Sequence, residues 1–353
     1  MKKSENSTVG NSTAAFSGGF RPLSNVFVLC VALLGGPSAA QPLPLQPGGP
    51  GEQVLEVPAP GLASPGVGQR GRVTVAVHGV GAWGPEALPV LYLPGFDAGT
   101  EDVRATVLPA LTAAVEAGRL RPLLVAVVDG RNGLGGGFYA GSWGDWLATA
   151  VPGLFRSLGV KGKPVLVGHS MGALGALRLA VAEPDVFAGV VAVSPVTGLE
   201  SVASARVVRR AAGLLAGGEG PSQWARTPTL AHFRERLFWA AVAAFMPQQR
   251  SWASALKGTS LTASTRRALV AQLEPQHAFG AVPRGFCDLP VKLYAGSRDV
   301  LVAEASVKRL GEALATACPG GDATRVRHDG DHLSRLPEDV VEGLAGLAAH
   351  AGR

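Results

Sequence analysis

The stretch Pro164-Val-Leu-Val-Gly-His-Ser-Met-Gly-Ala-Leu-Gly-Ala176 decides the fold of this chain. Its apolar run Val165–Val167 predicts a buried strand, and the Ala- and Leu-rich sequence after Ser170 predicts a helix. Gly168 and Gly172 flank the serine in a Gly-x-Ser-x-Gly pattern, which is typical of a sharp strand-to-helix turn that exposes a nucleophile. Small residues are needed there because side chains would block the turn. Ser170 is therefore the candidate nucleophile, and an ordinary glycine-rich turn is the alternative.

A nucleophilic serine needs a base and an acid, and after such a turn the chain order is serine, acid, histidine. Asp299 lies in a polar turn directly after the apolar run Val291–Ala295. His332 lies in the loop that follows a short predicted strand at Thr324–His328. We expect His332 to act as general base and then acid, with Asp299 fixing its tautomer and stabilising its cation.

Other residues compete for these two roles. The chain has seven histidines, and His328, the last residue of a predicted strand, is the strongest rival of His332. His328 also suits a structural role. His169 adjoins the nucleophile, but we expect its side chain to point away from the substrate. Asp288 and Asp331 could be mistaken for the acid, although both are typical of solvated loop carboxylates.

The third requirement is a pair of N–H groups that stabilise an oxyanion. Met171 follows the nucleophile at the start of the predicted helix, so its N–H is one expected donor. The second should come from the loop after an early strand, and Leu91–Asp97 fits that description. Within it, Gly95 would let the backbone approach the substrate and Phe96 would supply the N–H. A plain Pro-Gly turn is the alternative.

Residues 88–195 resemble the esterase D, or "putative esterase", branch of the α/β-hydrolases. The resemblance rests on Leu88–Phe96, on Gly136–Trp146, which contains Phe-Tyr and two tryptophans, and on Gly168–Leu177. It implies an α/β fold with a mostly parallel, doubly wound sheet of about eight strands and a helical cap-like insertion. It also implies cleavage of carboxylic esters through an acyl-enzyme on Ser170. The family includes feruloyl esterases, S-formylglutathione hydrolases and mycolyltransferases, so it leaves the substrate open.

Alternation of strand and helix patterns supports the same fold class. Helical patterns include Glu101–Ala117, Gly144–Leu158 and Glu304–Ala315. The expected strands are Gln53–Val57, Arg72–His78, Val90–Leu93, Leu123–Val128, Pro164–Val167, Gly189–Val193, Val291–Ala295 and Thr324–His328.

The N-terminal region is expected to direct export. Basic residues precede an apolar stretch that is too short to span a bilayer comfortably, and Ser38–Ala40 suits signal peptidase. We therefore expect residues 1–40 to be a secretory signal peptide, cleaved after Ala40, and the protein to be secreted or periplasmic. An uncleaved anchor or a disordered tail are the alternatives. Residues 41–71 should be a flexible lead-in that includes the first strand.

The catalytic domain is expected to span residues 72–353, with a helical insertion at about 198–288 where the strand pattern stops. Aromatic residues in and near this region are candidates to line a substrate pocket, although packing within the core is the alternative for any one of them. The candidates are Phe138, Tyr139, Trp143 and Phe279.

Two cysteines remain after removal of the signal peptide. Cys287 and Cys318 each precede a predicted strand, and neighbouring parallel strands begin at the same end of a sheet. We hypothesise that they form a disulfide, as is common in exported proteins.

Composition excludes some classes of function. The 353 residues carry a net charge of +6, which is too small to indicate nucleic-acid binding. Motifs for metals and cofactors are absent from the sequence, so we expect neither. The expected partner is a small-molecule, polysaccharide-linked or lipid-linked ester, without a stable membrane span after signal cleavage. An acyltransferase that uses the same intermediate, and a binding protein that has lost the chemistry, are the alternative functions.

Overall fold

The computed structural model describes residues 45–59, 72–95, 98–130, 139, 142–197, 284–299 and 301–351. Several sequence expectations lie outside these residues. They are the signal peptide at 1–40, the side chains of Phe96, Phe138 and Phe279, and the insertion at 198–288 except for its last residues. The lead-in expected at 41–71 is described only at residues 45–59, where it contains the first strand.

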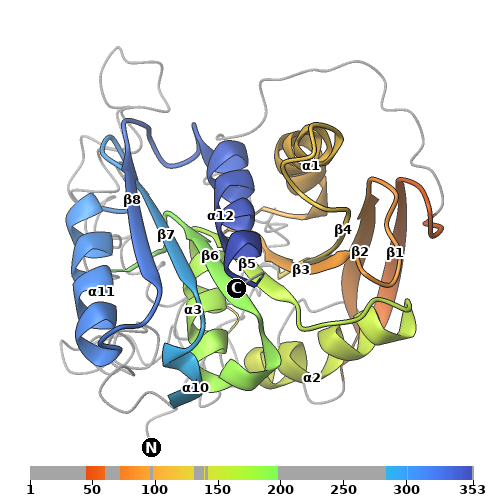
Figure 1. The fold of residues 1–353 in the computed structure, drawn as a ribbon, viewed down its shortest axis with the longest axis horizontal. Helices are drawn as coiled ribbons and strands as arrows, with labels where there is room; N and C mark the ends of the chain where they lie inside the picture. The colour runs from red at the N-terminus through yellow and green to blue at the C-terminus, as the bar shows by residue number, and fades with distance from the viewer. Residues whose placement is uncertain are drawn as a thin grey trace, which may run out of the picture.

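Eight strands form one sheet in the order β1-β2-β4-β3-β5-β6-β7-β8 (Figure 1). Strand β2 runs antiparallel to both of its neighbours, whereas the strands from β3 to β8 run parallel to one another. The predicted mostly parallel sheet of an α/β fold is therefore confirmed. The strands are β1 Gly51–Pro58, β2 Arg72–Val80, β3 Leu88–Leu93, β4 Leu123–Val128, β5 Val165–His169, β6 Gly189–Val193, β7 Val291–Gly296 and β8 Ala323–His328.

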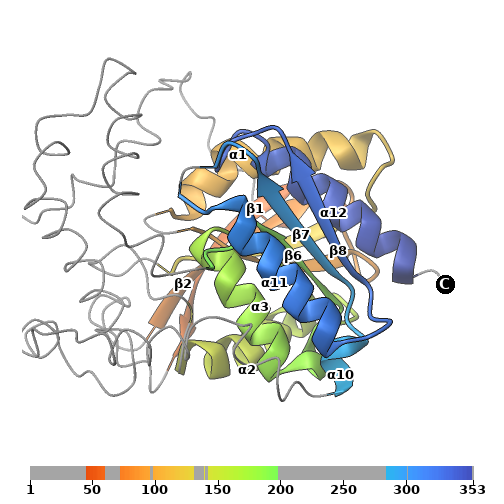
Figure 2. The same ribbon diagram turned by 90° about the vertical axis from the view of Figure 1, so that its left-hand side faces the viewer.

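Helices cover both faces of the sheet (Figure 2). On one face, buried residues of α1 and α12 pack against the strands, and on the other face those of α2, α3 and α11 do so. This two-sided covering is what connections between parallel strands require. The helices are α1 Thr100–Glu116, α2 Ser142–Ser157, α3 Met171–Ala182, the short η3 Pro184–Val186 and α10 Arg284–Cys287, α11 Glu304–Ala317 and α12 Leu336–Ala351.

Strand β4 shows why the centre of the sheet forms where it does. All six of its residues are buried, and successive side chains point to opposite faces. Leu123, Val125 and Val127 therefore join the core under α1 and α12. Leu124, Ala126 and Val128 join the core under α2 and α3. A continuous apolar run without polar alternation is the sequence signature of such a strand.

The carboxyl ends of the parallel strands lie along one edge of the sheet. The segments leaving β5, β7 and β8 at that edge carry the predicted nucleophile, acid and base. Ligand sites of open α/β sheets form at this edge. The fold thus brings together residues that are far apart in the sequence.

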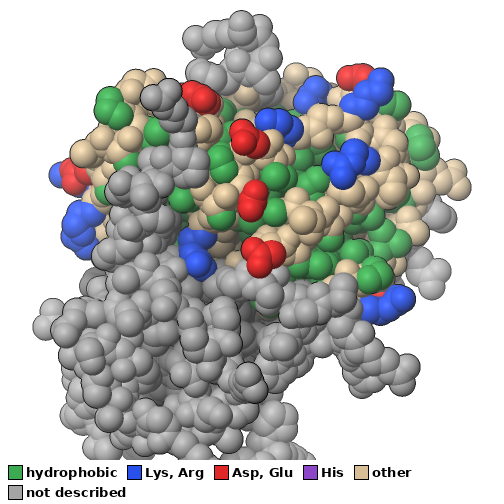
Figure 3. All heavy atoms as spheres, turned by 90° about the horizontal axis from the view of Figure 1, so that it is seen from below, with side chains coloured by type: hydrophobic (Ala, Val, Ile, Leu, Met, Phe, Trp, Pro, Cys, Tyr) green, Lys and Arg blue, Asp and Glu red, His purple; other side chains and the backbone are tan. Residues whose placement is uncertain are grey.

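The face of the molecule seen from below Figure 1 has a mixed charge. In its described part, acidic and basic side chains are dispersed among apolar and neutral ones (Figure 3). The modest positive charge of the chain is not gathered into one patch on this part of the surface.

Candidate active site

Ser170 occupies a strained turn between β5 and α3. Its φ of 55° and ψ of −118° lie where non-glycine residues rarely occur, and such strain is common at functional sites. Two backbone hydrogen bonds hold it there: Ser170 donates its N–H to the Val193 carbonyl at 2.9 Å, and Val196 donates to the Ser170 carbonyl at 3.1 Å. The turn is therefore anchored to the end of β6 on both sides of the candidate nucleophile.

The glycines beside Ser170 are required by close packing. A Cβ on Gly172 would overlap the carbonyl oxygen of Leu93 at the end of β3, and one on Gly168 would overlap the backbone of Gly172. Neither obstacle is a flexible side chain that could move aside. The Gly-x-Ser-x-Gly spacing therefore reflects contact between backbones, as the sequence predicted.

Asp299 and His332 are in contact across the ends of two strands. The Asp299 Oδ2 lies 2.7 Å from the His332 Nδ1, and the two side chains are 2% and 11% exposed. The other carboxylate oxygen accepts hydrogen bonds from the N–H groups of Leu301 and Val302, both at 2.8 Å. These two donors fix the carboxylate and stabilise its negative charge. The geometry is that of an acid that orients a catalytic imidazole.

His332 lies close to the turn that carries the nucleophile. Its ring centre is 5.8 Å from that of His169, the residue before Ser170. Among the described residues, the structure forms no hydrogen bond between Ser170 and His332. Contacts between base and nucleophile are often loose in structures without substrate. The structure thus brings all three predicted residues to one end of the sheet, with the acid and the base already paired.

His169 is nearer to the site than expected from the sequence. Its ring packs on Gly95, where a Cβ would lie 2.6 Å from the His169 Cε1. Burial, with the nearby His332 as a smaller cause, lowers the pKa of His169 to about 3, so the ring is neutral. The neutral His169 ring therefore lies next to both Gly95 and the candidate base His332.

The two expected oxyanion donors are described to different extents. Met171 is buried and opens α3, where the positive end of the helix dipole favours an anion. Phe96 lies outside the described residues. Its neighbours Pro94 and Gly95 pack beside the turn that carries Ser170. The Pro94 carbonyl accepts a hydrogen bond from the Tyr139 hydroxyl at 3.3 Å.

Tyr139 and Trp143, which were expected to line the pocket, are instead core residues. They are 4% and 5% exposed, and their rings meet edge to face at 5.9 Å. Trp146 continues the stack at 6.0 Å from Trp143 and donates its indole N–H to the Pro58 carbonyl. The glycine-rich sequence around Tyr139 suggested an open loop, but its ring fills the space beside Gly130 and Gly175.

Asp331 has a structural role that the sequence interpretation missed. Its carboxylate accepts hydrogen bonds from the N–H groups of Leu333 and Ser334, at 3.0 and 2.9 Å. The Ser334 hydroxyl in turn accepts the N–H of Asp331 at 2.9 Å. These bonds, with that from Leu333 first, lower the pKa of Asp331. The Asp-x-x-Ser spacing could have indicated such a turn around His332.

Neither of the remaining rivals takes part in the candidate triad. Asp288 follows α10 and precedes β7, at the opposite end of this strand from Asp299. His328 does not pair with Asp299. Its Nε2 lies 3.0 Å from the Asp339 Oδ2 in α12.

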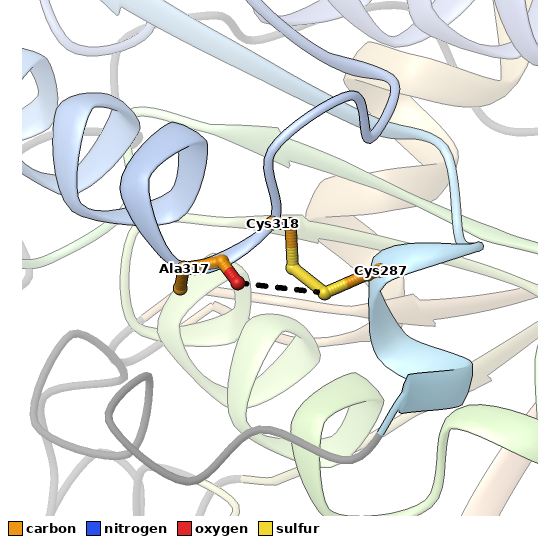
Figure 4. Close-up of a disulfide and its surroundings, with 3 residues drawn as sticks. All are labelled: Cys287, Ala317 and Cys318. Carbon is orange, nitrogen blue, oxygen red and sulfur yellow. Dashed lines mark hydrogen bonds between the residues drawn. A yellow bond between two sulfur atoms is a disulfide. The ribbon is translucent and has the colours of Figure 1, made fainter.

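The structure joins Cys287 and Cys318 in a disulfide (Figure 4). Their Cα atoms are 5.1 Å apart, and the bond links the end of α10 to the end of α11. The carbonyl oxygen of Ala317 lies 3.8 Å from the Cys287 sulfur. The bond thus ties together the segments that lead into β7 and β8, at the end of the sheet opposite the candidate triad.

No described group of three or more His, Cys, Asp or Glu residues is arranged to hold a metal ion. Within the same residues, no helix has both the length and the apolar character needed to cross a bilayer.

Known proteins share both the fold and part of the sequence. Residues 138–278 match the family model described as "Putative esterase". No curated protein matches the chain. Three solved structures illustrate the similarity of fold.

A ferulic acid esterase is 12% identical, with a TM-score of 0.56, and the match covers 85% of this chain and 98% of that one. An S-formylglutathione hydrolase from Agrobacterium tumefaciens is 16% identical, with a TM-score of 0.52, covering 86% and 97%. A Pyrococcus furiosus esterase is 16% identical, with a TM-score of 0.51, covering 88% and 96%. At these identities the structures show the fold alone. Together with the family match over residues 138–278, this fold confirms the resemblance to the putative esterases and supports carboxylic-ester hydrolysis.

Proposed function

We propose that the protein is an exported serine esterase that cleaves its substrate through an acyl-enzyme on Ser170. The observation that carries this proposal is the 2.7 Å contact between Asp299 and His332, next to the strained turn of Ser170. Acyl transfer by a serine requires a buried carboxylate, an imidazole and a serine held in a turn where its hydroxyl can attack. Their order along the chain agrees with the fold.

In the proposed reaction, the Ser170 Oγ attacks the ester carbonyl while the Nε2 of His332 accepts the hydroxyl proton. The Nδ1–H of His332 faces the Asp299 carboxylate, which stabilises the imidazolium that forms. The N–H groups of Met171 and Phe96 would bind the oxyanion of the tetrahedral intermediate.

When that intermediate collapses, the C–O bond to the alcohol breaks and His332 returns its proton to the leaving oxygen. The acyl group is then bonded to Ser170. A water molecule, deprotonated by His332, attacks the acyl carbonyl. The C–O bond to the Ser170 Oγ then breaks, the acid is released, and His332 returns the proton to Oγ. Each step uses only the three side chains and the two N–H groups already named.

Export is part of the proposal. Disulfides persist in oxidising compartments, so the pairing of Cys287 with Cys318 supports a secreted or periplasmic location. The sequence of residues 1–40 supports it independently. A small ester is the substrate class that the family match supports, and we extend the proposal to esters linked to polysaccharide or lipid.

The test uses p-nitrophenyl esters from acetate to palmitate with residues 41–353, beside Ser170→Ala. We expect activity in the native protein that disappears in the variant, and a chain-length profile that reports the depth of the pocket. A fluorophosphonate should label Ser170 and no other residue. Turnover that survives in Ser170→Ala would overturn the proposal. Labelling of Ser170 with acyl transfer to added alcohols in place of hydrolysis would favour an acyltransferase.

A further inference from the structure

A second histidine–aspartate pair lies where the two ends of the segment that carries His332 meet. His328 is the last residue of β8, Asp339 lies in the first turn of α12, and the segment between them includes His332. The His328 Nε2 lies 3.0 Å from the Asp339 Oδ2, and the side chains are 4% and 1% exposed. The contact therefore joins the two ends of this segment inside the protein.

The contact is close but does not have the geometry of a hydrogen bond. Among the described residues, both ring nitrogens of His328 and both carboxylate oxygens of Asp339 are buried without a hydrogen-bond partner. The nearest cation is Arg335, whose Nε is 3.6 Å from the Asp339 Oδ1, but its side chain is 40% exposed and its Nη2 donates to Glu342 at 3.0 Å. Buried polar groups of this kind are costly unless paired, so each depends on the other.

Burial shifts both members of the pair toward their uncharged forms. It lowers the pKa of His328 and raises that of Asp339 to about 7. Glu338 and Glu342 act on these groups from α12, Arg335 acts from the residue before that helix, and Asp299 and Asp331 act from the neighbouring turns. A neutral imidazole beside a carboxylic acid places no net charge in the interior.

The ring of His328 also supports the catalytic loop by direct packing. A Cβ on Gly330 would lie 2.6 Å from the His328 Nδ1, and one on Gly296 would overlap the Gly330 carbonyl oxygen. The His328 carbonyl accepts the N–H of Ser297 at 2.9 Å, and the Gly330 carbonyl accepts that of Arg298 at the same distance. These contacts connect the pair to the turns of both Asp299 and His332.

We propose that His328 and Asp339 are positioning residues. By holding together the two ends of the loop that carries His332, they set the position of its imidazole relative to Ser170. The inference rests on the proposed function. The pair touches no reacting atom, so its loss should lower the rate of acyl transfer and leave substrate binding unchanged. A displacement of about 1 Å in such a site can cost about a hundredfold in rate.

The test compares Asp339→Ala with Asp339→Asn. The alanine variant removes the contact, and we expect kcat to fall by tenfold to about a hundredfold with KM within about twofold of native. Labelling of Ser170 by fluorophosphonate should slow by the same factor. The asparagine variant keeps a polar side chain of the same size against His328, so its kcat should stay within about threefold of native. Glu312→Gln, a change at an exposed residue of α11 that pairs with Lys308, is the control expected to leave kcat unchanged.

A double variant, His328→Leu with Asp339→Leu, tests the pair if Asp339→Ala fails to fold. Apolar replacement of a buried pair often preserves stability, so this protein should fold while its kcat remains low. Native kcat in either folded variant would overturn the inference, and so would an equal loss in Asp339→Asn and Asp339→Ala. The proton NMR signal of the Asp299–His332 hydrogen bond, which needs no activity, should weaken in both variants that lack the pair. Retained activity in Ser170→Ala would instead overturn the proposed function, so the two failures are distinguishable.

Discussion

The His332–Asp299 and His328–Asp339 pairs contain the same two residue types, and their histidines are four residues apart, but their carboxylates are held in opposite ways. Asp299 accepts two backbone N–H groups in addition to its contact with His332. Asp339 has no such donors, and its partner is also fully buried. Backbone donors favour the charged carboxylate, whereas burial without them favours the acid.

The comparison shows that the hydrogen-bond donors and burial around the carboxylate, and not the residue types, distinguish a reactive pair from a structural one. A carboxylate that stays charged can stabilise an imidazolium when the base takes a proton. A pair that avoids charge suits the interior, where it can fix the position of a loop. The exposed fractions of the two histidine side chains fit this distinction, since 11% of His332 is exposed and 4% of His328.

The largest expected effect separates the two histidines. His332→Gln should lower kcat for the best p-nitrophenyl ester by about 10⁴-fold or more, because it removes the base. His328→Gln should cost no more than about a hundredfold, since it only disturbs the position of the base. Steady-state kinetics on both purified variants checks this, with circular dichroism as the control for folding. Equal losses would remove the distinction between the pairs.

Removal of the disulfide should change stability without changing chemistry. Cys287→Ser with Cys318→Ser releases the ends of α10 and α11, at the opposite end of the sheet from both pairs. We expect a loss of about 3 kcal/mol in the free energy of unfolding, with native kcat in the folded protein. Urea unfolding of the native and variant proteins measures the first quantity. Two free thiols in the denatured native protein would contradict the disulfide itself.

Asp331 offers a smaller test of how the loop is held. Asp331→Ala removes the hydrogen bonds to Leu333 and Ser334, and should cost about 1 kcal/mol of stability and about threefold in kcat. Asp329→Ala is the matched control, because its side chain is 83% exposed and, among the described residues, it pairs with Arg298 and Ser297 at the surface. The result to look for is a difference between these neighbours in thermal unfolding and kcat. If they behave alike, the Asp331 bonds do not hold the loop.

The smallest predicted effect is on the pH dependence of stability. The pKa of Asp339 is raised to about 7 in the folded protein, so its contribution is fully present below its unfolded value of 3.8 and is lost as the pH rises through 7. We expect this loss to be on the order of 1 kcal/mol between pH 5 and 8, because partial burial and coupled neighbours weaken it. Urea unfolding of the native protein and of Asp339→Asn at several pH values isolates the contribution of Asp339 to the free energy of unfolding. A native curve that falls no more than that of the variant would contradict this assignment.

His169 should act in the opposite direction at lower pH. Burial depresses its folded pKa to about 3, so its contribution is present above 6.5 and is lost as the pH falls toward 3. The native protein is therefore expected to lose stability on both sides of neutrality.

The sheet and the residues of the candidate triad could be predicted because local patterns mark them. Apolar runs of strand length fixed β4 and β6 at the bounds that the structure has, and Gly168 and Gly172 mark the turn at Ser170. Asp299 and His332 follow strands in polar turns, which limits the number of candidates. In each case the signal lies within a few residues of the feature.

Contacts between distant segments could not be predicted in the same way. Asp339 looks like a surface acid in the first turn of a helix, and its contact with His328 depends on how α12 returns across the sheet. Tyr139, in a glycine-rich sequence, and Trp143, on a predicted helix, were candidates to line a pocket, but their rings pack edge to face in the core. Long-range packing decided both outcomes.

Rapid mixing with p-nitrophenyl acetate, followed by acid quenching and intact-mass and peptide mass spectrometry, examines the acyl-enzyme itself. We predict a burst of p-nitrophenol close to one equivalent of enzyme, and an acetyl group on the peptide that contains Ser170. His332→Gln should form this adduct far more slowly. Steady turnover without any adduct on Ser170, under conditions where the acylated form is trapped, would contradict the proposed mechanism.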